Sequence, residues 1–525
     1  MIRLSALALP LALVAATPAL ADPPGGLDAR IEELLKATAT PGMAVAIVED
    51  GKIVHAKGYG VRRLGAPEKV NADTIFTIGS TAKAMTSAAL ATLVDAGKIG
   101  WDDRVVDHLP GFQMYDAWVT REMTVRDLLV HRSGLGMGAG DLLYIPRGSY
   151  SRDEIVRRLR YIRPATSFRS GYAYDNVLYI VAGALIEAVS GQSWEAYLRD
   201  HVLRPSGMTR ATDTFDQLFA TANRAYPHAR FGGAVRGTGP MRRLDEADHL
   251  PQASAPAGLL AASANDMARW LQVQLNQGAL PDGGRVYSEA SAREMWAPVT
   301  PMPIAELPEP IAGTQPSFDA YALGWEVRDY RGHRIIWHAG GVYGSTSVVV
   351  LIPERKTGFA IEINSEEAEP RFGLMYELLD HYLGLPHTDW AARFGAYRRQ
   401  RIAAAEAAVA QKGATPAQVG PSLPLARYAG RYVDPWYGPL SITADAQGLT
   451  ADFVPTPRMK GRLTHYQYDT FVVRFDDPAI EPAYLTFALD AEGKVARITA
   501  KAVSPIADFS YDYGDLAFAP EGAAR

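Results

Sequence analysis

The order of predicted strands and helices constrains the fold of this chain most strongly. Residues 43–48 are uniformly apolar, Asp50–Gly51 is a typical hairpin turn, and residues 52–59 can return as a second strand. Helical patterns and loops then dominate residues 101–280. Further strands are predicted beyond Tyr321, at Gly324–Asp329, Arg334–His338, Ser345–Ile352 and Gly358–Asn364. Strands at both ends of a helical middle predict an α+β domain, with helices packed against an antiparallel sheet.

The last quarter of the chain has a different character. Residues 391–412 are rich in alanine and predict a helix, and residues 413–424 are rich in Gly, Pro and Ser, as linkers are. Residues 425–520 show short alternating strands separated by turn signals, which predict a small β-barrel or sandwich. We therefore expect a first domain over residues 22–390, a helical linker over 391–424 and an all-β domain over 425–525.

The N-terminus has the pattern of an export signal. Arg3 precedes the apolar run Leu4–Ala16, and Ala19-Leu20-Ala21 forms an A-x-A cleavage site. We expect residues 1–21 to be removed and the mature protein to be periplasmic or secreted, with no membrane span. The alternative is an uncleaved anchor, for which the apolar run is short.

Charge and cysteine content exclude several classes of function. The net charge is −5 and there is no long basic run, which disfavours nucleic acid as a partner. The chain has no cysteine, so disulfides, thiolate metal sites and cysteine catalysis are excluded. The sequence contains neither H-E-x-x-H nor G-x-S-x-G, so zinc hydrolases and nucleophile-elbow hydrolases lack support.

Ser80-Thr81-Ala82-Lys83 is the main candidate for catalysis. Lys83 is the only lysine of the chain with a serine three residues before it, and a strongly helical stretch follows. Residues at i and i+3 share a helix face, so the hydroxyl and the amine can meet. A serine hydroxyl needs a neighbouring base to act as a nucleophile, and burial lowers the pKa of a lysine towards the range where it serves as one. Taken alone, S-x-x-K can also arise by chance.

Two further motifs are ambiguous when each is taken alone. Tyr174-Asp175-Asn176 precedes an apolar helix predicted over Asn176–Val189, and the phenol of Tyr174 can relay protons if a nearby lysine lowers its pKa. Its alternative is a tyrosine-rich turn that caps a helix. His338-Ala339-Gly340-Gly341 ends a predicted strand, where glycines allow another backbone to approach. Its alternative is a structural histidine followed by a turn.

Together, in this order, the three motifs resemble the signature of the serine β-lactamase-like and penicillin-binding-protein-like hydrolases, the group of the class C β-lactamases and their related serine peptidases. That signature is S-x-x-K, Y-x-N, then K-T-G or H-x-G. The resemblance extends over residues 28–385 and includes Thr124–Leu135, Pro256–Leu260 and Leu323–Trp325. It implies the β-lactamase/transpeptidase fold, with a helical subdomain beside the sheet and the cleft between them.

The resemblance also implies roles for the residues. Ser80 would form an acyl-enzyme, with Lys83 and Tyr174 sharing the role of base. The backbone N–H groups of Ser80 and Gly341 would stabilise the oxyanion. The remaining members of the site are Asn176, which would bind a substrate amide, His338, which would bind a polar or anionic group, and Gly340, beside the substrate. No metal or cofactor is expected.

A second K-T-G occurs at Lys356-Thr357-Gly358. It lies between two apolar runs, so we interpret it as a solvated hairpin turn and take His338–Gly340 as the third motif. Within the group, H-x-G is more typical of peptidases and esterases. His131 is interpreted as a residue that holds a loop, and His249 as one that could border the site.

These features favour a serine peptidase acting on short, linear or D-residue-containing peptides. Linearised cyclic peptides are one specific class, as for the peptidases that degrade linearised microcystin. The alternatives are a carboxylesterase with the same site and a non-catalytic peptidoglycan-fragment sensor. The C-terminal domain resembles the lipocalin-like barrel of some H-x-G peptidases, and it would either cover the cleft or build a homo-oligomer.

Overall fold

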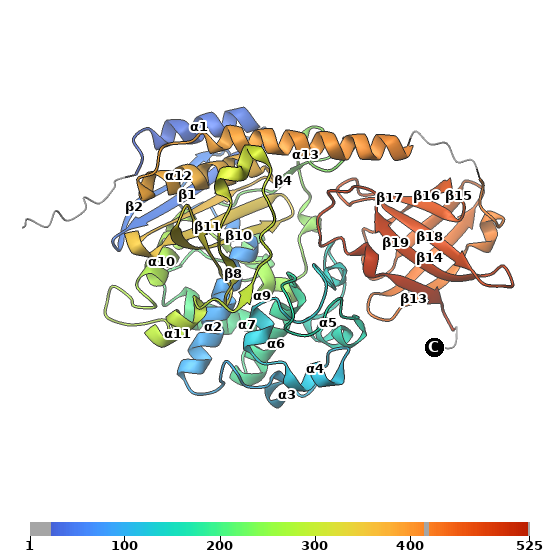
Figure 1. The fold of residues 1–525 in the computed structure, drawn as a ribbon, viewed down its shortest axis with the longest axis horizontal. Helices are drawn as coiled ribbons and strands as arrows, with labels where there is room; N and C mark the ends of the chain where they lie inside the picture. The colour runs from blue at the N-terminus through green and yellow to red at the C-terminus, as the bar shows by residue number, and fades with distance from the viewer. Residues whose placement is uncertain (1–22, 414–418, 523–525) are drawn as a thin grey trace, which may run out of the picture.

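The computed structural model describes residues 23–413 and 419–522 of the chain. The expected export signal at residues 1–21 lies outside these residues, as does the central part of the expected linker, residues 414–418. A sheet with helices on both sides forms the first domain, and a barrel forms the second (Figure 1). The expected α+β domain followed by a small all-β barrel is confirmed.

The first domain is built around an eight-stranded antiparallel sheet with the strand order β2-β1-β12-β11-β10-β9-β8-β7. The central strands β1, β11 and β12 are buried along their whole length, as expected for strands covered on both faces. Segments far apart in the sequence pair directly, because Met43 lies opposite Ile363. The strands are β1 (Gly42–Glu49), β2 (Lys52–Gly60), β7 (Thr300–Pro301), β8 (Asp319–Tyr321), β9 (Glu326–Tyr330), β10 (His333–Val342), β11 (Ser345–Ile352) and β12 (Thr357–Ile363).

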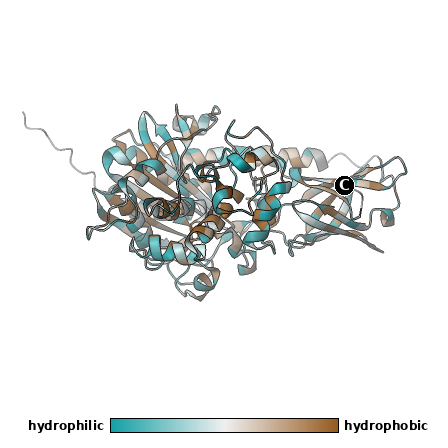
Figure 2. Cartoon of the chain, turned by 90° about the horizontal axis from the view of Figure 1, so that it is seen from below, coloured by the Kyte–Doolittle hydropathy of each residue, from teal (hydrophilic) through white to brown (hydrophobic). Residues whose placement is uncertain are grey.

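Helices cover both faces of the sheet. Helices α1, α12 and α13 lie on one side, and α2 and α10 lie on the other, towards the helical subdomain (Figure 1). In Figure 2, brown and teal segments alternate along most ribbons of both domains, so hydrophobic and hydrophilic residues occur in the same elements. The longer helices are α1 (Leu27–Thr38), α2 (Lys83–Asp95), α6 (Val177–Ser190), α10 (Ala264–Leu275), α12 (Leu374–Leu383) and α13 (Trp390–Gly413).

Short elements complete the helical subdomain and its edges. They are the helices α3 (Val105–His108), α4 (Ala117–Glu122), α5 (Arg152–Arg158), α7 (Trp194–Leu198), α8 (Phe215–Ala220), α9 (Ala255–Gly258) and α11 (Glu289–Met295), and the strands β3 (Phe76–Thr77), β4 (His228–Arg230), β5 (Met241–Arg243) and β6 (Ala261–Ala262). Ser263 and Asp266 form a capping box at the start of α10, which begins directly after the cap at Ala264.

Strand β10 is longer than the sequence predicts. The predicted strand ends at His338, but pairing with β11 continues to Val342, with Gly341 opposite Thr346. The continuation requires glycine, because a Cβ on Gly340 would lie 2.1 Å from the carbonyl oxygen of Ile78. Of the K-T-G at residues 356–358, Lys356 ends the β11–β12 turn with 76% of its side chain exposed, as expected, whereas Thr357 and Gly358 are buried in β12.

The C-terminal domain is a closed eight-stranded antiparallel barrel, which confirms the expected lipocalin-like architecture. Residues alternate between interior and surface along strands such as β18. Aromatic side chains fill the interior, including Phe453, Phe471 and Phe487. The strands are β13 (Gly430–Asp434), β14 (Gly438–Asp445), β15 (Gly448–Phe453), β16 (Lys460–Gln467), β17 (Thr470–Phe475), β18 (Ala483–Leu489), β19 (Val495–Ala502) and β20 (Ala517–Pro520).

The barrel contacts the first domain through polar side chains. The Tyr150 hydroxyl donates to the carbonyl of Tyr437 at 2.8 Å, and Arg458 forms an ion pair with Asp248 at 2.6 Å. The loop between β19 and β20, residues 503–516, extends from the barrel towards the helical subdomain. In the described part of the chain no single helix is long and apolar enough to cross a membrane, whereas the bent pair Val177–Ser190 and Trp194–Leu203 passes that test by length and composition.

Candidate active site

Ser80 and Lys83 meet where the sheet adjoins the helical subdomain. Ser80 lies in the short helix η1 (Gly79–Ala82), which runs directly into α2 at Lys83. The Lys83 Nζ atom lies 3.0 Å from the Ser80 Oγ atom, so the contact expected from the i, i+3 spacing is present. Gly79 has φ +54°, and a Cβ there would lie 2.5 Å from the backbone nitrogen of Gly341. The serine turn and the end of β10 are therefore packed backbone to backbone.

The amine of Lys83 is buried, and no carboxylate among the residues that the structure describes forms an ion pair with it. Its Nζ atom also donates to Asn176 Oδ1 at 2.7 Å and to the carbonyl of Ala257 at 2.5 Å. The rings of Tyr174 and Tyr179 lie within about 5 Å of it, at 4.9 and 5.1 Å. Burial lowers the pKa of Lys83 to about 7. A neutral amine at this position has a lone pair that can accept the proton of the Ser80 hydroxyl.

Tyr174 lines the same site as Ser80, and its ionisation differs from expectation. The sequence suggested that a nearby lysine cation lowers the pKa of the phenol. Instead, burial raises the pKa of Tyr174 well above its ordinary value. The physical reason is that desolvation of a phenolate dominates where the neighbouring lysine is itself easily neutralised. Tyr174 is therefore a neutral phenol, able to donate one proton while it accepts another.

Asn176 is held in place by a carboxyl group that the sequence did not single out. Its Nδ2 atom donates to Asp141 Oδ2 at 2.9 Å, which turns its Oδ1 atom towards Lys83. Asp141 also accepts from the Tyr144 hydroxyl at 2.6 Å and from the Ser510 hydroxyl at 2.7 Å. Burial raises the pKa of Asp141 to about 7. Ser510 belongs to the C-terminal domain, so that domain is connected to Lys83 through Asp141 and Asn176.

His338 lies in the site as a neutral ring. Its Nδ1 atom is 2.7 Å from the carbonyl oxygen of Ala339, and its Nε2 atom is 2.7 Å from the Tyr321 hydroxyl. A carbonyl only accepts, so Nδ1 carries the proton and Nε2 accepts from Tyr321. Burial lowers the pKa of His338 to about 3. The sequence allowed His338 to bind either a polar or an anionic group of the substrate. A neutral ring fits a contact with a polar group and does not fit an ion pair with an anion.

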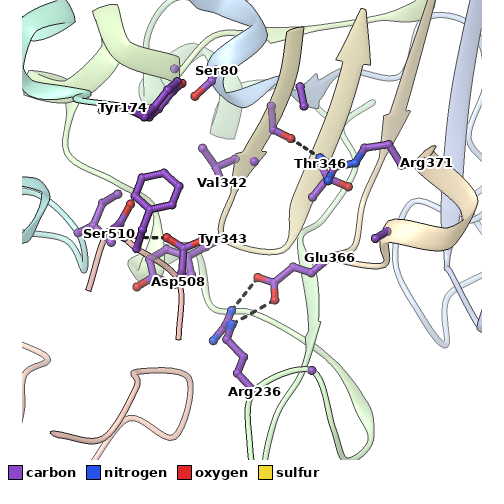
Figure 3. Close-up of a pocket in the computed structure, with 18 of the residues that line it drawn as sticks. Ser80, Tyr174, Arg236, Val342, Tyr343, Thr346, Glu366, Arg371, Asp508 and Ser510 are labelled. Carbon is purple, nitrogen blue, oxygen red and sulfur yellow. Dashed lines mark hydrogen bonds and ion pairs between the residues drawn. The ribbon is translucent and has the colours of Figure 1, made fainter. Parts of the chain in front are cut away.

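These residues line a cavity of about 730 Å³ that both domains form. Figure 3 shows Ser80 and Tyr174 at one end, Val342 and Thr346 on the neighbouring strands, and Asp508 and Ser510 entering from the barrel. The ring of Phe509 packs edge-on against that of Tyr174, with centroids 5.7 Å apart. All seven predicted site residues therefore lie in or at this cavity: Ser80, Lys83, Tyr174, Asn176, His338, Gly340 and Gly341.

We expect Ser510→Ala to lower kcat/KM by about 5-fold, because it removes one hydrogen bond, worth about 1 kcal/mol, from the group that orients Asn176. Steady-state kinetics on any hydrolysed substrate measure the effect. Ser504→Ala is the matched control, since Ser504 lies in the same loop and its Oγ atom accepts from Ile506 N instead. An equal loss in both variants would mean that the loop as a whole, and not the Ser510 hydroxyl, matters.

His131, which the sequence predicted to hold a loop, joins its own loop to the one that carries Tyr174. It is fully buried, its Nδ1 atom lies 3.0 Å from Asp175 Oδ1, and its ring contacts that of Tyr174 at 4.1 Å. His249 packs against Phe215 and Phe219 and is not among the residues that line the main cavity. Across residues 23–413 and 419–522, no group of three or more His, Asp or Glu side chains is arranged to hold a metal ion.

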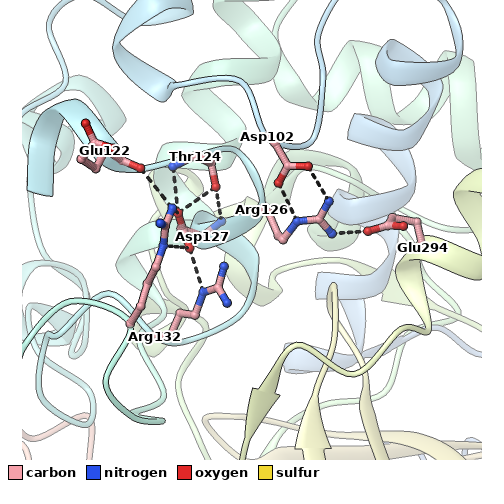
Figure 4. Close-up of polar contacts among 8 residues, drawn as sticks. Asp102, Glu122, Thr124, Arg126, Asp127, Arg132 and Glu294 are labelled. Atoms are coloured by element: carbon pink, nitrogen blue, oxygen red, sulfur yellow. Dashed lines mark hydrogen bonds and ion pairs between the residues drawn. The ribbon is translucent and has the colours of Figure 1, made fainter.

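The loop that carries His131 is fixed by a buried carboxylate, Asp127 (Figure 4). Asp127 accepts from Arg132 Nε at 2.8 Å, Arg169 Nε at 3.0 Å and Thr124 Oγ1 at 2.7 Å. Burial disfavours the charged form, but the hydrogen bonds from Arg169 and Thr124 outweigh it and lower the pKa of Asp127. The arrangement explains the local sequence Thr124–Leu135 as a structural support.

Replacing Asp127 with alanine is expected to reduce the free energy of unfolding by about 3–5 kcal/mol, because it leaves two arginines without their buried partner. Urea denaturation measures this change. Asp102→Ala is the control, since Asp102 pairs with Arg126 on the surface with 75% of its side chain exposed, and we expect a loss of about 1 kcal/mol or less. Similar losses in the two variants would contradict the assigned role of Asp127.

Comparison with known proteins agrees with this arrangement. Residues 27–383 match the beta-lactamase family model, and residues 414–520 match a domain of unknown function, DUF3471. An unguisins hydrolase of Aspergillus campestris is 31% identical, over 80% of this chain and 78% of the relative's length. Penicillin-binding protein 4 of Amycolatopsis lactamdurans is 30% identical, over 66% of this chain and 86% of the relative's length. The octameric penicillin-binding protein homologue of Pyrococcus abyssi superposes with a TM-score of 0.60 at 20% identity, covering 91% of this chain and 97% of that one.

The chain therefore belongs to the beta-lactamase family, whose members share this fold and include serine hydrolases. Motifs in the first 390 residues were sufficient to reach that conclusion. Asp141 and Ser510 were missed because neither lies in a recognisable motif. The only signal near Asp141 is the glycine-rich stretch before it, in which Gly138 and Gly140 both have positive φ.

Proposed function

We propose that the protein is an exported serine hydrolase that forms an acyl-enzyme on Ser80. The observation that supports this best is the 3.0 Å contact between Ser80 Oγ and the Nζ atom of a fully buried Lys83. A lysine whose pKa is about 7 is a base at neutral pH, and a base in contact with a serine activates it as a nucleophile.

In the proposed reaction, Ser80 Oγ attacks the substrate carbonyl while its proton moves to Lys83. The negative oxygen of the tetrahedral intermediate accepts hydrogen bonds from the backbone N–H groups of Ser80 and Gly341. As the bond between carbonyl carbon and leaving group breaks, Tyr174 gives its phenol proton to the leaving group and takes up the proton that Lys83 received from Ser80, so that both Lys83 and Tyr174 end the step neutral. Water then attacks the ester of Ser80 with the same groups acting in reverse, which releases the acid and restores the hydroxyl. The chain's own residues supply every proton transfer.

The substrate proposed is a short, linear peptide, including peptides with D-residues and linearised cyclic peptides. Beyond Trp337, strand β10 has no pairing with β9, so an extended peptide can lie along this edge. Phe509 and Asp508 close one side of the cavity, which favours chains that are short or thin enough to enter. Asn176 offers an amide to the substrate backbone. A curated relative named for the hydrolysis of unguisins adds unguisins to the compounds to be tried.

A carboxylesterase is the second candidate, because the same groups would cleave an ester and the H-x-G motif places a neutral histidine beside the strand edge. Hydrolysis rates of paired amides and esters with identical acyl groups distinguish the two candidates. We expect D- or L-peptide amides to be cleaved, with Ser80→Ala as the blank. Cleavage of esters alone would favour the carboxylesterase over the peptidase. Cleavage of neither substrate would favour the non-catalytic peptidoglycan-fragment sensor.

A further inference from the structure

Arg371 is a buried arginine whose position in the fold needs an explanation. It lies in the short helix η10 (Glu369–Gly373), between β12 and α12, and its guanidinium stacks on Phe372 at 4.1 Å. Its Nη1 atom donates to the carbonyl oxygen of Gly340 at 2.9 Å and to that of Ser347 at 3.4 Å. Figure 3 shows it reaching the strands from the side away from Ser80.

No carboxylate neutralises this arginine among the residues that the structure describes. Its Nε atom is buried without a hydrogen-bond partner, and burial lowers the pKa of Arg371 to about 10. A buried cation that lacks an acid costs free energy, and such costs concentrate at functional sites. The guanidinium makes its hydrogen bonds to the carbonyl oxygens of Gly340 and Ser347. These two contacts are therefore what has to be explained.

The carbonyl of Gly340 and the N–H of Gly341 belong to the same peptide unit. A trans peptide is planar, and its C=O and N–H point in opposite directions. A guanidinium that holds the carbonyl oxygen of Gly340 therefore aims the N–H of Gly341 away from η10. On that opposite side lies the serine turn, because the Gly341 nitrogen is 2.5 Å from the place that a Cβ on Gly79 would take.

On one side this peptide is held by the ladder with β11, in which Gly340 lies opposite Ser347 and Gly341 opposite Thr346. The pairing of β10 with β9 ends at Trp337, so the edge beyond it has no ladder on that side. Residues 340 and 341 are both glycine, and glycine has wide access to other backbone conformations. A Cβ on Gly341 would meet nothing within 4 Å, so the space on the side-chain side of this residue is open.

We propose that Arg371 is a positioning residue for the oxyanion hole: by binding the carbonyl of Gly340 it holds the Gly341 N–H towards the carbonyl under attack by Ser80. This inference rests on the proposed function. The positive charge on the carbonyl side also polarises the peptide, which makes the N–H a stronger donor, and in a buried site this effect is weakly screened.

The test uses the full-length protein and substitutions at Arg371. We expect Arg371→Met to lower kcat/KM for a neutral ester such as p-nitrophenyl acetate by about 10- to 100-fold, less than or equal to the loss on removing an oxyanion donor. The loss should be in kcat, with KM nearly unchanged, and the rate of labelling by a fluorophosphonate should fall in parallel. Arg371→Lys keeps a cationic donor and should recover part of the loss.

Arg328→Met is the matched control. Arg328 is also buried, lies over the ring of Trp337 at 5.3 Å, donates to the backbone carbonyl of Thr314 at 2.8 Å and has a buried Nε atom without a partner. It has no contact with the Gly340–Gly341 peptide. The control should lose stability in a thermal melt as Arg371→Met does, but keep its labelling rate within about 3-fold.

Two results would overturn the proposal. Unchanged turnover of the neutral ester, with a raised KM only for substrates that carry a carboxylate, would make Arg371 a binding site for a substrate anion. Equal losses in the Arg328 and Arg371 variants would make it a structural residue. Failure of the wild-type protein to react with the fluorophosphonate would instead overturn the proposed function itself, and with it this role of Arg371. If Arg371→Met does not fold, the comparison of kcat/KM and labelling rate between Arg371→Lys and wild type tests the proposal instead.

Discussion

Ser80→Ala is expected to abolish hydrolysis, lowering kcat/KM by roughly 10⁴-fold or more. The variant removes the atom that forms the covalent bond. Within residues 23–413 and 419–522 no other hydroxyl makes the same contact with the amine of Lys83, since the remaining acceptors of Nζ there are an amide and a backbone carbonyl. The fold should be retained, because the change deletes one oxygen. Steady-state assays of the purified variant, with a thermal melt, measure both quantities.

Ser87→Ala is the control for this variant. Ser87 is buried two turns further along α2 and does not line the cavity. It should keep near wild-type activity, which would show that a small change in the helix is tolerated. Substantial turnover by Ser80→Ala would contradict the covalent mechanism and move the nucleophile elsewhere in the cavity, or to water.

Lys83→Met is expected to lower kcat by roughly 10³-fold, within the range that general bases contribute. Methionine has a similar length and fits a buried site, so the loss reports the amine and not a cavity. The wild-type rate should rise with pH through about 7, because the neutral amine is the base and the pKa of Lys83 is about 7. Above that pH the rate should stay level, since Tyr174 keeps its proton.

The Lys83→Met variant should lose the increase of rate with pH as well as most of the rate itself. Measurement of kcat/KM between pH 5 and 9 for wild type and variant checks both. A wild-type rate that does not change through pH 7, or a rise that survives in the Lys83 variant, would assign the base to another group. Asp141 and Asp175 are the groups to examine then, because burial raises their pKa values to about 7 and 8.

Much of the fold could be predicted from local patterns. The apolar run at residues 43–48 and the strands around residues 345–364 were recognisable because central strands buried on both faces are continuously hydrophobic. The S-x-x-K spacing predicted the Ser80–Lys83 contact because i, i+3 neighbours share a helix face. The Lys356 turn was distinguished from the site strand because it is a polar stretch between two apolar runs.

Features that depend on long-range contacts could not be predicted. The extension of β10 to Val342 depends on its pairing with β11 and on the close approach of Ile78 to Gly340. The contact of Ser510 with Asp141 joins residues 369 positions apart, and the contact of Arg371 with Gly340 depends on where η10 packs. The raised pKa of Tyr174 was predicted in the wrong direction because burial, which the sequence does not show, outweighs the neighbouring amine.

The most direct test of the central claim is intact-mass spectrometry of the purified protein after exposure to a fluorophosphonate, followed by peptide mapping. Activation of Ser80 by Lys83 predicts a single adduct on wild type, mapped to Ser80, slow labelling of Lys83→Met and none of Ser80→Ala. A folded wild-type protein that takes up no adduct, or an adduct that persists in Ser80→Ala, would contradict the assignment of Ser80 as the nucleophile.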